Sequence, residues 1–479
     1  MKRSSIDKKS EIYKEGTRLI TVFLGIGVLF LMLVCHLTYI ELWGKNKFMD
    51  NAFNQRQWKK EQNTIRGDIT DCGGVVLAHS EKQSDGTQTR VYDFGSAYAH
   101  VIGYNSKVYG KSQLELTYNK ELAGLTELSN LSDITAKIQG EKKGNTVKLT
   151  ISNNLQQTAI KALSGRAGSV VALDPKTGEV LCMASNPSFN PSAKYLADNW
   201  TNLNSAENSP FLFRATSGQY SPGSIFKTVI LSAAYENGLR DMEFDDNGEV
   251  TFGGKTFKNS GSHAYGHIDL KKAYTVSSNV AFMTLGNELG EEKVEEYIKK
   301  FKLVDKINFD IPTQNGHYKE EGSLSEDELA QLSIGQGTLL VTPLKMAMMA
   351  GTIANGGVMM KPYIVKQVKT DLGIDVMNGR QKALGRVIQP ATADFVKECM
   401  ESVVTSGTGT AASVYGIKVA GKTGTAENEI KGKDHAWFVG FAPADDPQIA
   451  VCVMLEYSGS SGGAAAAPVA AKVIREYLK

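Results

Sequence analysis

The longest unbroken apolar run of the chain lies close to its N-terminus. Residues 19–40 span 22 positions without a formal charge at neutral pH. A helix of that length would reach about 33 Å at about 1.5 Å per residue, which is enough to cross the hydrocarbon core of a bilayer. The pattern therefore predicts a transmembrane anchor at residues 19–40, preceded by a cytoplasmic tail at residues 1–18.

The flanks of this run indicate its orientation. Basic residues outnumber acidic ones before it: Lys2, Arg3, Lys8, Lys9, Lys14 and Arg18 against Asp7, Glu11 and Glu15. A basic flank keeps that end of a helix in the cytoplasm, so we expect the chain beyond about Trp43 to lie outside. A cleaved signal peptide and a buried core helix are the alternatives. Signal peptides usually have an apolar region of only about 7–15 residues, and residues 37–43 offer no small-residue cleavage site.

The first stretch after the anchor is mostly polar. Residues 45–60 have the pattern of a polar helical stalk. Residues 66–78 alternate apolar and polar positions around Gly73-Gly74, which is typical of a β-hairpin. The remainder has too little apolar periodicity for a large core. We therefore expect a small α+β juxtamembrane module at residues 41–150.

The hydrophobic pattern becomes stronger further along the chain. Two pairs of apolar runs, each joined by a turn signal, predict two further hairpins. They are residues 169–174 with 179–184, and residues 435–441 with 449–455. Helical patterns fill much of the interval, and a proline-led helix is expected at residues 468–478. Strands at both ends with helices between them predict a mixed α+β domain at residues 151–479.

Composition and charge exclude several classes of function. The apolar content of 42% and charged content of 22% are those of a folded globular protein. The net charge of +2 implies no large single-sign field, so we expect no nucleic-acid partner. The cysteines are odd in number and form no C-x-x-C pair, so buried, unpaired thiols are expected rather than disulfides or a zinc site. They are Cys35, Cys72, Cys182, Cys399 and Cys452.

Candidate chemistry begins at Ser224. Pro222 and Gly223 precede an apolar run of good helix formers, which places Ser224 in the first turn of a helix. Lys227 then lies three residues on, on the same face. A serine hydroxyl is a weak nucleophile until a base takes its proton, and a lysine becomes that base when burial or nearby cations lower its pKa. Backbone N–H groups at the helix start would stabilise an oxyanion.

Each short motif of this kind occurs more than once in the chain, so none is decisive alone. S-x-x-K occurs at residues 5–8 and 224–227, S-x-N at 152–154 and 277–279, and K-T-G at 176–178 and 422–424. The first K-T-G falls in a predicted hairpin turn. The copies at Ser224, Ser277 and Lys422 are the significant ones, because penicillin-recognising serine enzymes have the three motifs in this order along the chain.

The ordered motifs belong to a wider resemblance. Over almost its whole length the chain resembles class B penicillin-binding proteins, the monofunctional wall transpeptidases. The matching stretches are residues 66–78, 173–181 with 186–191, 222–227, 277–280, 335–337 and 421–426. The resemblance implies a penicillin-binding transpeptidase domain, an antiparallel sheet flanked by helices, after one transmembrane helix and the small module. Cys72 departs from it, because the family often has a basic residue there, and this puts the local contacts of the module in question.

The resemblance implies catalytic roles for five residues. Ser224 would attack a peptide carbonyl, and Lys227 would accept its proton. Ser277 would relay a proton to the leaving amine. Asn279 would hydrogen-bond the Lys227 amine and the substrate backbone. Lys422 would add positive charge for the substrate carboxylate and would help to keep Lys227 neutral.

Three further residues would bind substrate. Thr423 and Thr425 would offer hydroxyls to the carboxylate, although strand propensity alone also explains threonines there. Gly424 would leave room for the substrate backbone beside an edge strand. The backbone N–H groups of Ser224 and Thr425 would form the oxyanion hole. Gln336, between two glycines, is interpreted as part of a structural turn.

Other functions are weighed on the same motifs. A β-lactamase or D,D-carboxypeptidase would need a base that activates water, and no clear E-x-x-L-N element follows residues 277–279. An inactive scaffold or a β-lactam sensor would be expected to lose one of Ser224, Lys227 and Lys422. A Ser-His-Asp mechanism is disfavoured because no histidine stands in a comparable set of motifs, and His263, His267 and His435 show no metal-ligand spacing.

The resemblance also implies partners. We expect peptidoglycan stem peptides or lipid-linked precursor strands as substrates, β-lactams as inhibitors, and no cofactor or metal. The stretch before the transpeptidase domain is too short for a glycosyltransferase domain of its own. A SEDS-type glycosyltransferase in the membrane is therefore expected as a partner, contacted by the anchor and the juxtamembrane module.

Overall fold

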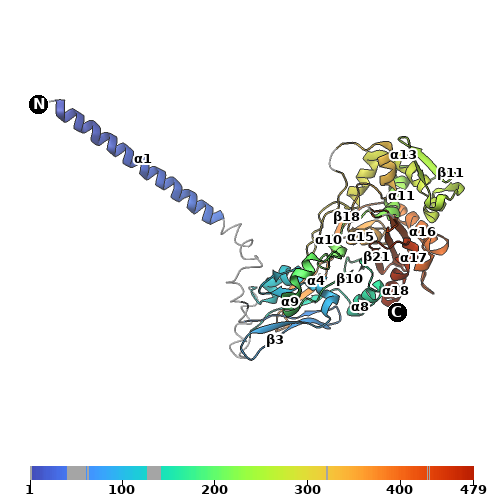
Figure 1. The fold of residues 1–479 in the computed structure, drawn as a ribbon, viewed down its shortest axis with the longest axis horizontal. Helices are drawn as coiled ribbons and strands as arrows, with labels where there is room; N and C mark the ends of the chain where they lie inside the picture. The colour runs from blue at the N-terminus through green and yellow to red at the C-terminus, as the bar shows by residue number, and fades with distance from the viewer. Residues whose placement is uncertain are drawn as a thin grey trace. The chain divides into compact units, whose positions relative to one another are not determined.

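The computed structural model describes residues 3–39, 61, 64–126, 142–319, 322–428, 430 and 432–479. The chain divides into two units, residues 1–60 and residues 61–479, each of which is described by itself (Figure 1). The predicted stalk at residues 45–60 and Ile40, at the end of the predicted anchor, lie outside the described residues.

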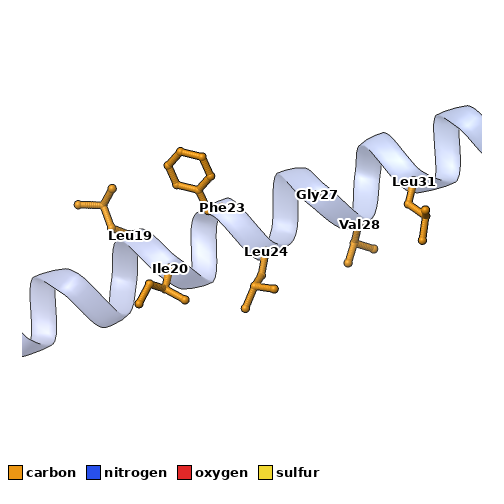
Figure 2. Close-up of a pocket in the computed structure, with 7 residues that line it drawn as sticks. All are labelled: Leu19, Ile20, Phe23, Leu24, Gly27, Val28 and Leu31. Carbon is orange, nitrogen blue, oxygen red and sulfur yellow. The ribbon is translucent and has the colours of Figure 1, made fainter.

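The first unit contains one long helix, α1, from Arg3 to Tyr39. Its segment Gly16–Tyr39 is long and apolar enough to span a membrane. In the described part of the chain, no second helix meets these two conditions. Figure 2 shows apolar side chains such as Leu19 and Phe23 projecting from this helix, and its large apolar side chains are exposed. Exposing apolar surface to water costs about 25 cal/mol per Å². The helix therefore fits a single-pass membrane anchor.

Five antiparallel strands form the central sheet of the second unit, in the order β10-β9-β21-β20-β19. Their bounds are Gly168–Leu173 (β9), Val180–Asn186 (β10), Ala420–Ala426 (β19), His435–Ala442 (β20) and Ile449–Leu455 (β21). The two hairpins predicted in this part of the chain are confirmed as β9–β10 and β20–β21. Strand β19, which carries the second K-T-G, lies at the edge of the sheet.

Helices cover both faces of this sheet. Successive residues of a strand point to opposite faces, and in β9 Val171 and Leu173 pack into one apolar core whereas Val170 and Ala172 pack into another. Helix α15 (Pro343–Ala354) contributes to the first core. Helices α8 (Asn153–Leu163) and α18 (Ala467–Tyr477) contribute to the second. The mixed α+β class and the proline-led C-terminal helix are thereby confirmed.

Further helices and strands belong to the second unit. They are α9 (Ala193–Ser205), α10 (Arg214–Ser217), β12 (Glu249–Phe252), β13 (Lys255–Lys258), η4 (Ser260–Ser262), β14 (Gly266–Asp269), α14 (Glu326–Ser333), β15 (Val358–Met360), β18 (Ala383–Arg386), α16 (Pro390–Ser406), η5 (Thr410–Ala412) and α17 (Gly462–Ala465).

A second sheet has six strands in the order β17-β16-β8-β2-β3-β4. Their bounds are Ile69–Thr70 (β2), Val76–Lys82 (β3), Gln88–Tyr92 (β4), Thr146–Leu149 (β8), Val365–Lys369 (β16) and Asp375–Asn378 (β17). The hairpin predicted at residues 66–78 is confirmed as β2–β3. Strands β16 and β17 come from far along the chain, so this sheet draws on both sides of residue 150. The domain boundary predicted there stays a prediction.

The remaining short elements lie beside this second sheet in sequence. They are β1 (Thr64–Ile65), η2 (Gly95–Tyr98), α4 (Ala99–Ile102), β5 (Asn105–Ser106), β6 (Gly110–Lys111), α5 (Gln113–Thr117), α6 (Asn119–Leu122) and β7 (Lys142–Lys143).

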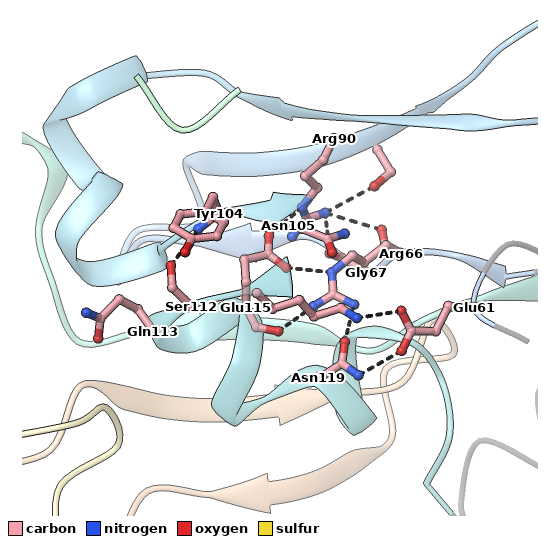
Figure 3. A network of polar contacts seen from close by, with 12 residues as sticks. Glu61, Arg66, Gly67, Arg90, Tyr104, Asn105, Ser112, Gln113, Glu115 and Asn119 are labelled. Carbon is pink, nitrogen blue, oxygen red and sulfur yellow. Dashed lines mark hydrogen bonds and ion pairs between the residues drawn. The ribbon is translucent and has the colours of Figure 1, made fainter. Parts of the chain in front are cut away.

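A buried ion cluster ties α5 to the chain around β2 and β4 (Figure 3). The fully buried Glu115 carboxylate accepts hydrogen bonds from Arg66 Nε at 2.5 Å and from Arg90 Nε at 2.7 Å. Burial alone would raise the pKa of Glu115, but the two guanidinium groups hold it below its ordinary value. Arg66, the first residue of the stretch that resembles the penicillin-binding family, therefore has a structural role.

The cysteines are unpaired, as the sequence predicts. Cys182, Cys399 and Cys452 are buried, whereas Cys35 is exposed on α1 and Cys72 is half-buried, which corrects the expectation that all five are buried. Cys72 donates its backbone N–H to the Ile151 carbonyl at 2.9 Å. The unusual residue at this position is thus held by a backbone contact that does not depend on its side chain.

Candidate active site

Ser224 lies in a tight turn that leads into a helix. The turn, η3 (Gly223–Phe226), is a 3₁₀-helix, and α11 (Lys227–Glu236) follows it directly. The prediction of a helix start is confirmed, but the turn is 3₁₀ rather than α. With three residues per turn, a 3₁₀-helix places residues i and i+3 in line. Ser224, which is half-buried, therefore shares a face with the fully buried Lys227.

Two glycines meet backbone to backbone under this turn. Gly223 donates its N–H to the Gly335 carbonyl at 2.8 Å. Both glycines have positive φ, and a Cβ on Gly335 would lie 2.1 Å from the Gly223 oxygen. No other residue type fits such a contact. This position supports the interpretation of Gly335-Gln336-Gly337 as a structural turn.

The Lys227 amine is surrounded by oxygen atoms of the S-x-N segment. Its Nζ donates to the Ser277 carbonyl at 2.9 Å, to Ser277 Oγ at 3.4 Å and to Asn279 Oδ1 at 2.8 Å. Burial and the charge of Lys422 lower the pKa of Lys227 well below its ordinary value, against an opposing effect of Asp246. Such a shift favours the neutral amine, which is the form of lysine that can accept a proton.

Lys422 approaches the same serine from β19. Its Nζ donates to Ser277 Oγ at 2.8 Å and to the Thr423 carbonyl at 3.1 Å. The side chain is fully buried, and this burial lowers its pKa to about 7. The Ser277 hydroxyl therefore lies between two lysine amines, in a position to pass a proton from one group to another.

Ser277 and Asn279 are positioned by the junction of two helices, α12 (Leu270–Val276) and α13 (Asn279–Lys300). Ser277 ends α12 with a left-handed backbone (φ 61°), which is uncommon for a residue other than glycine and which concentrates at functional sites. Ser278 caps α13 by accepting from the Ala281 N–H at 3.0 Å. The sharp turn points the Ser277 carbonyl and the Asn279 amide at Lys227.

Strand β19 brings the K-T-G segment beside the nucleophile turn. Its contact with that turn is close, because a Cβ on Gly223 would lie 2.5 Å from the Thr425 carbonyl oxygen. Thr425 is half-buried and pairs with Ala436 of β20. Thr423 is buried and shares a hydrogen bond of 2.6 Å with the Thr408 hydroxyl.

Gly424 lies against the turn that carries Ser224. A Cβ there would lie 3.0 Å from Ile225 Cγ2 and 3.1 Å from the Pro222 carbonyl oxygen. The glycine therefore leaves room for the turn that carries Ser224. Its predicted role beside a substrate backbone stays a prediction.

The structure brings Lys227, Ser277, Asn279 and Lys422 into one hydrogen-bonded cluster, with Ser224 one turn from Lys227. Within the described residues no hydrogen bond joins the Ser224 hydroxyl to the Lys227 amine. Neither is there a group of His, Cys, Asp and Glu side chains, in the part of the chain described, that could hold a metal ion. His435 accepts from the Tyr457 N–H at 3.1 Å and contacts the Tyr220 ring, so it has a structural position.

Several residues of the site carried no signal in the sequence. Trp437 of β20 donates from its indole N–H to the Ser221 carbonyl at 3.1 Å and so holds the segment before the nucleophile turn. Asp246, Asn259 and Ser278 form a buried network behind Asn279. Ser278 lies inside the S-x-N triplet and was the one position of this network that sequence reasoning could have singled out.

Comparison with known families identifies the family to which the chain belongs. The family model described as the penicillin binding protein transpeptidase domain matches residues 168–475, which include every candidate site residue. The chain belongs to the penicillin-binding transpeptidases. A second model, the penicillin binding protein A dimerisation domain, matches residues 66–147, within the predicted juxtamembrane module of this penicillin-binding transpeptidase.

Curated relatives match over most of the chain. A peptidoglycan D,D-transpeptidase named PbpA, from Mycolicibacterium smegmatis, is 32% identical over 97% of this chain and 99% of its own length. A peptidoglycan D,D-transpeptidase named MrdA, from Acinetobacter baumannii, is 30% identical over 85% of this chain and 70% of its own length.

A solved structure has the same architecture. The ceftriaxone acyl-enzyme complex of penicillin-binding protein A from M. tuberculosis superimposes with a TM-score of 0.83 at 29% identity. The superposition covers 88% of this chain and 99% of that one. The predicted class B penicillin-binding fold is confirmed by this likeness and by the family match.

Proposed function

We propose that this chain is a membrane-anchored peptidoglycan D,D-transpeptidase that cross-links stem peptides through an acyl-enzyme on Ser224. β-lactams would acylate the same hydroxyl and act as inhibitors. The observation that supports this most directly is the environment of Lys227. It is a fully buried lysine one turn from Ser224, hydrogen-bonded to Ser277 and Asn279 beside a second buried lysine. Relatives at 30–32% identity are named peptidoglycan D,D-transpeptidases.

In the acylation step Ser224 Oγ attacks the carbonyl carbon of the terminal D-Ala-D-Ala peptide bond, and its proton passes to neutral Lys227. As the tetrahedral intermediate collapses, the proton passes from Lys227 through the Ser277 hydroxyl to the leaving nitrogen. The C–N bond breaks, the amine departs, and an ester is left on Ser224. The distances from Ser277 Oγ of 3.4 Å to Lys227 and 2.8 Å to Lys422 support this relay.

In the second step the amine of another stem peptide attacks the ester. A new amide bond forms, the ester bond breaks, and the proton lost by the amine returns to Ser224 Oγ through Ser277 and Lys227. Lys227 thus begins and ends the cycle neutral. Its depressed pKa supports this role, because a lysine at its ordinary pKa would be protonated at neutral pH.

Substrate orientation is assigned to β19. As an edge strand it has free backbone groups for an extended peptide. Lys422, Thr423 and Thr425 would bind the terminal carboxylate, and the N–H groups of Ser224 and Thr425 would stabilise the oxyanion. The close approach of the Thr425 backbone to Gly223 supports this pairing. The Ser224–Lys227 hydrogen bond would form when substrate binds, since catalytic hydrogen bonds often tighten only in the complex.

The orientation in the membrane is part of the proposal. The basic flank before α1 supports a cytoplasmic tail at residues 1–18 and a catalytic domain at residues 151–479 outside the membrane. Protease added to right-side-out vesicles should then digest the chain beyond residue 40. Protection of that part of the chain would contradict the orientation.

A SEDS-type glycosyltransferase is the proposed membrane partner, contacted by α1 and by the juxtamembrane module at residues 41–150. The anchor supports this partnership because it would place the two proteins in the same bilayer. Replacement of residues 16–39 by an unrelated apolar helix should reduce co-purification with such a partner. Unchanged co-purification of this variant and of a second one lacking residues 66–147 would contradict the proposal.

Mass spectrometry of the penicillin adduct tests the function directly. The wild-type protein should carry the adduct on Ser224 and release it slowly, whereas the variant Ser224→Ala should carry none. Rapid release would indicate a hydrolase such as a β-lactamase or carboxypeptidase. An adduct on another serine, or a labelled Ser224→Ala variant, would contradict the assignment.

A further inference from the structure

A buried carboxylate lies behind the S-x-N segment. Strand β11 (Glu243–Asp246) alternates between exposed and buried side chains: Glu243 and Asp245 are exposed, whereas Phe244 and Asp246 are buried. Asp246 is fully buried and ends the strand on the side that contacts α12 and α13. A buried carboxylate is costly unless donors and an opposite charge compensate it, so its surroundings indicate its role.

Three groups donate to Asp246. The Gly248 N–H lies at 2.9 Å, Asn259 Nδ2 lies at 2.7 and 2.9 Å from the two carboxylate oxygens, and Ser278 Oγ lies at 2.5 Å. All three donors are neutral. The carboxylate is thus fully hydrogen-bonded but has no direct ion-pair partner among the described residues.

Two of these donors hold the start of α13. Asn259 Oδ1 accepts from the N–H groups of Asn279 at 2.7 Å and Val280 at 3.1 Å. Ser278 Oγ, which donates to Asp246, accepts from the Ala281 N–H. Asp246 therefore fixes the orientation of both side chains that hold the helix start. That helix start carries the Asn279 amide, 2.8 Å from Lys227.

We propose that Asp246 is a positioning residue of the transpeptidase site, which holds Asn279 against Lys227 through Asn259 and Ser278 and supplies the negative charge behind the two lysines. The inference rests on the proposed function, in which Lys227 is the proton acceptor for Ser224. It adds a residue that touches no reacting atom and that none of the recognised motifs contains.

The charges around Lys227 support the electrostatic part. Burial and Lys422 lower the pKa of Lys227, and Asp246 raises it. Two tyrosines are further titratable groups in these surroundings. The buried hydroxyl of Tyr274 shares a hydrogen bond with Thr228 and has a raised pKa, and burial and Asp246 raise the pKa of Tyr265. Asp246 is therefore the negative charge that offsets Lys422. Its removal should lower the pKa of Lys227 further.

The test uses two neighbouring aspartates of the same strand. Asp246→Asn keeps the size and can still accept from Gly248 and Asn259, but it removes the charge. Asp245→Asn makes the same change on the exposed face, where Asp245 contacts His267. The second-order rate of acylation by one penicillin is measured from pH 5 to pH 9 for the full-length protein and both variants.

We expect the acid limb of the profile to move about one pH unit lower in Asp246→Asn, the scale of one nearby charge at an effective dielectric constant of about 20. Asp245→Asn should keep the wild-type limb. A further variant, Ser278→Ala, keeps the charge of Asp246 and removes the Ser278 hydroxyl. In all it loses two hydrogen bonds of Ser278 Oγ, the one to Asp246 and the one from the Ala281 N–H, so it should lower the rate about tenfold at every pH and leave the limb in place.

An unmoved limb in a folded Asp246→Asn protein, or an equal shift in Asp245→Asn, would overturn the inference. If Asp246→Asn does not fold, as judged by thermal unfolding, Ser278→Ala decides: a lowered rate supports the positioning role and a native rate overturns it. A wild-type protein that forms no Ser224 adduct would instead contradict the proposed function, so the two failures are distinguishable.

Discussion

The tripeptide Lys-Thr-Gly occurs in two settings in this molecule. Residues 176–178 form the turn between β9 and β10, where the Lys176 side chain is 51% exposed and pairs with Asp446. Residues 422–424 lie in the edge strand β19, where Lys422 is fully buried and donates to Ser277 at 2.8 Å. The same three residues thus make a solvated turn in one place and part of a candidate active site in the other.

The difference is caused by the surroundings, not by the residues. Burial lowers the pKa of Lys422 to about 7. An exposed ion pair such as Lys176–Asp446 is worth only about 0–1 kcal/mol. The glycines differ as well. Gly178 has φ +81° and is required by its turn, whereas Gly424 has ordinary φ and is required by the packing of Ile225. Matched substitutions in the two settings test this comparison.

The largest effect is expected for the lysine that must be neutral. Arginine cannot lose its proton in a protein, so Lys227→Arg keeps the charge and loses the base. Acylation by a penicillin should slow by about 10²- to 10⁴-fold. Lys176→Arg, the same change in the exposed turn, should acylate at the wild-type rate. A near-native rate for Lys227→Arg would mean that Lys227 only supplies charge and that another group takes the proton.

Lys422→Met should reduce acylation by about 10²- to 10³-fold, because it removes the charge that we propose binds the substrate carboxylate. Lys176→Met should change neither acylation nor stability by a measurable amount. Rates with one β-lactam, measured for both variants beside the wild type, check this. Equal losses in both variants would remove the distinction between the two settings.

Thermal unfolding of Lys422→Met tests the direction in which the stability changes with pH. The folded pKa of about 7 lies below the ordinary 10.5, so the unfolded chain binds more protons between these values and stability rises with pH across that range. Below pH 7 the buried charge costs the most. The methionine variant should therefore gain thermal stability at pH 6, and this gain should shrink above pH 7. A loss of stability that is the same at every pH would contradict the assigned pKa.

The sequence predicted what local patterns encode. The β9–β10 and β20–β21 hairpins follow from apolar runs around turn residues, and the helix start at Ser224 follows from Pro222 and Gly223 before a helix-forming run. The order of the motifs was enough to select residues 422–424 over residues 176–178. These predictions need only neighbours along the chain.

Contacts between residues far apart along the chain could not be predicted from the sequence pattern. Strands β16 and β17 join a sheet whose other strands lie more than 200 residues earlier, and nothing in their pattern names that partner. Asp246 is one acidic residue among 51 until the fold buries it behind Ser278. The contact between Gly424 and Ile225 could not be predicted for the same reason, because it exists only after β19 packs on the nucleophile turn.

The glycine pair separates packing from backbone strain. In Gly424→Val the new side chain would press on Ile225 and the Pro222 carbonyl, and displacement of the Ser224 turn should slow acylation about 100-fold. In Gly178→Val the strained turn and a Cβ 2.3 Å from the Lys361 carbonyl oxygen should lower the melting temperature instead, with acylation of the folded protein unchanged. Normal acylation by a folded Gly424→Val protein would contradict the site.

The smallest effect is expected for the threonine pair. Thr423 has one hydroxyl proton and shares a 2.6 Å hydrogen bond with Thr408. If the Thr408 hydroxyl donates in that pair, the Thr423 proton is free to bind the substrate carboxylate. Thr423→Ala then removes a charge-assisted hydrogen bond worth about 1.5–3 kcal/mol, so acylation should slow roughly 10- to 100-fold. Thr177→Ala removes only an acceptor for the Glu179 N–H at 3.2 Å and should leave acylation unchanged.

The β-lactam must carry a carboxylate, because an analogue without that group should not distinguish Thr423→Ala from the wild type. Equal slowing with both compounds would show that Thr423 acts through Thr408 on the position of the strand, and not on the substrate.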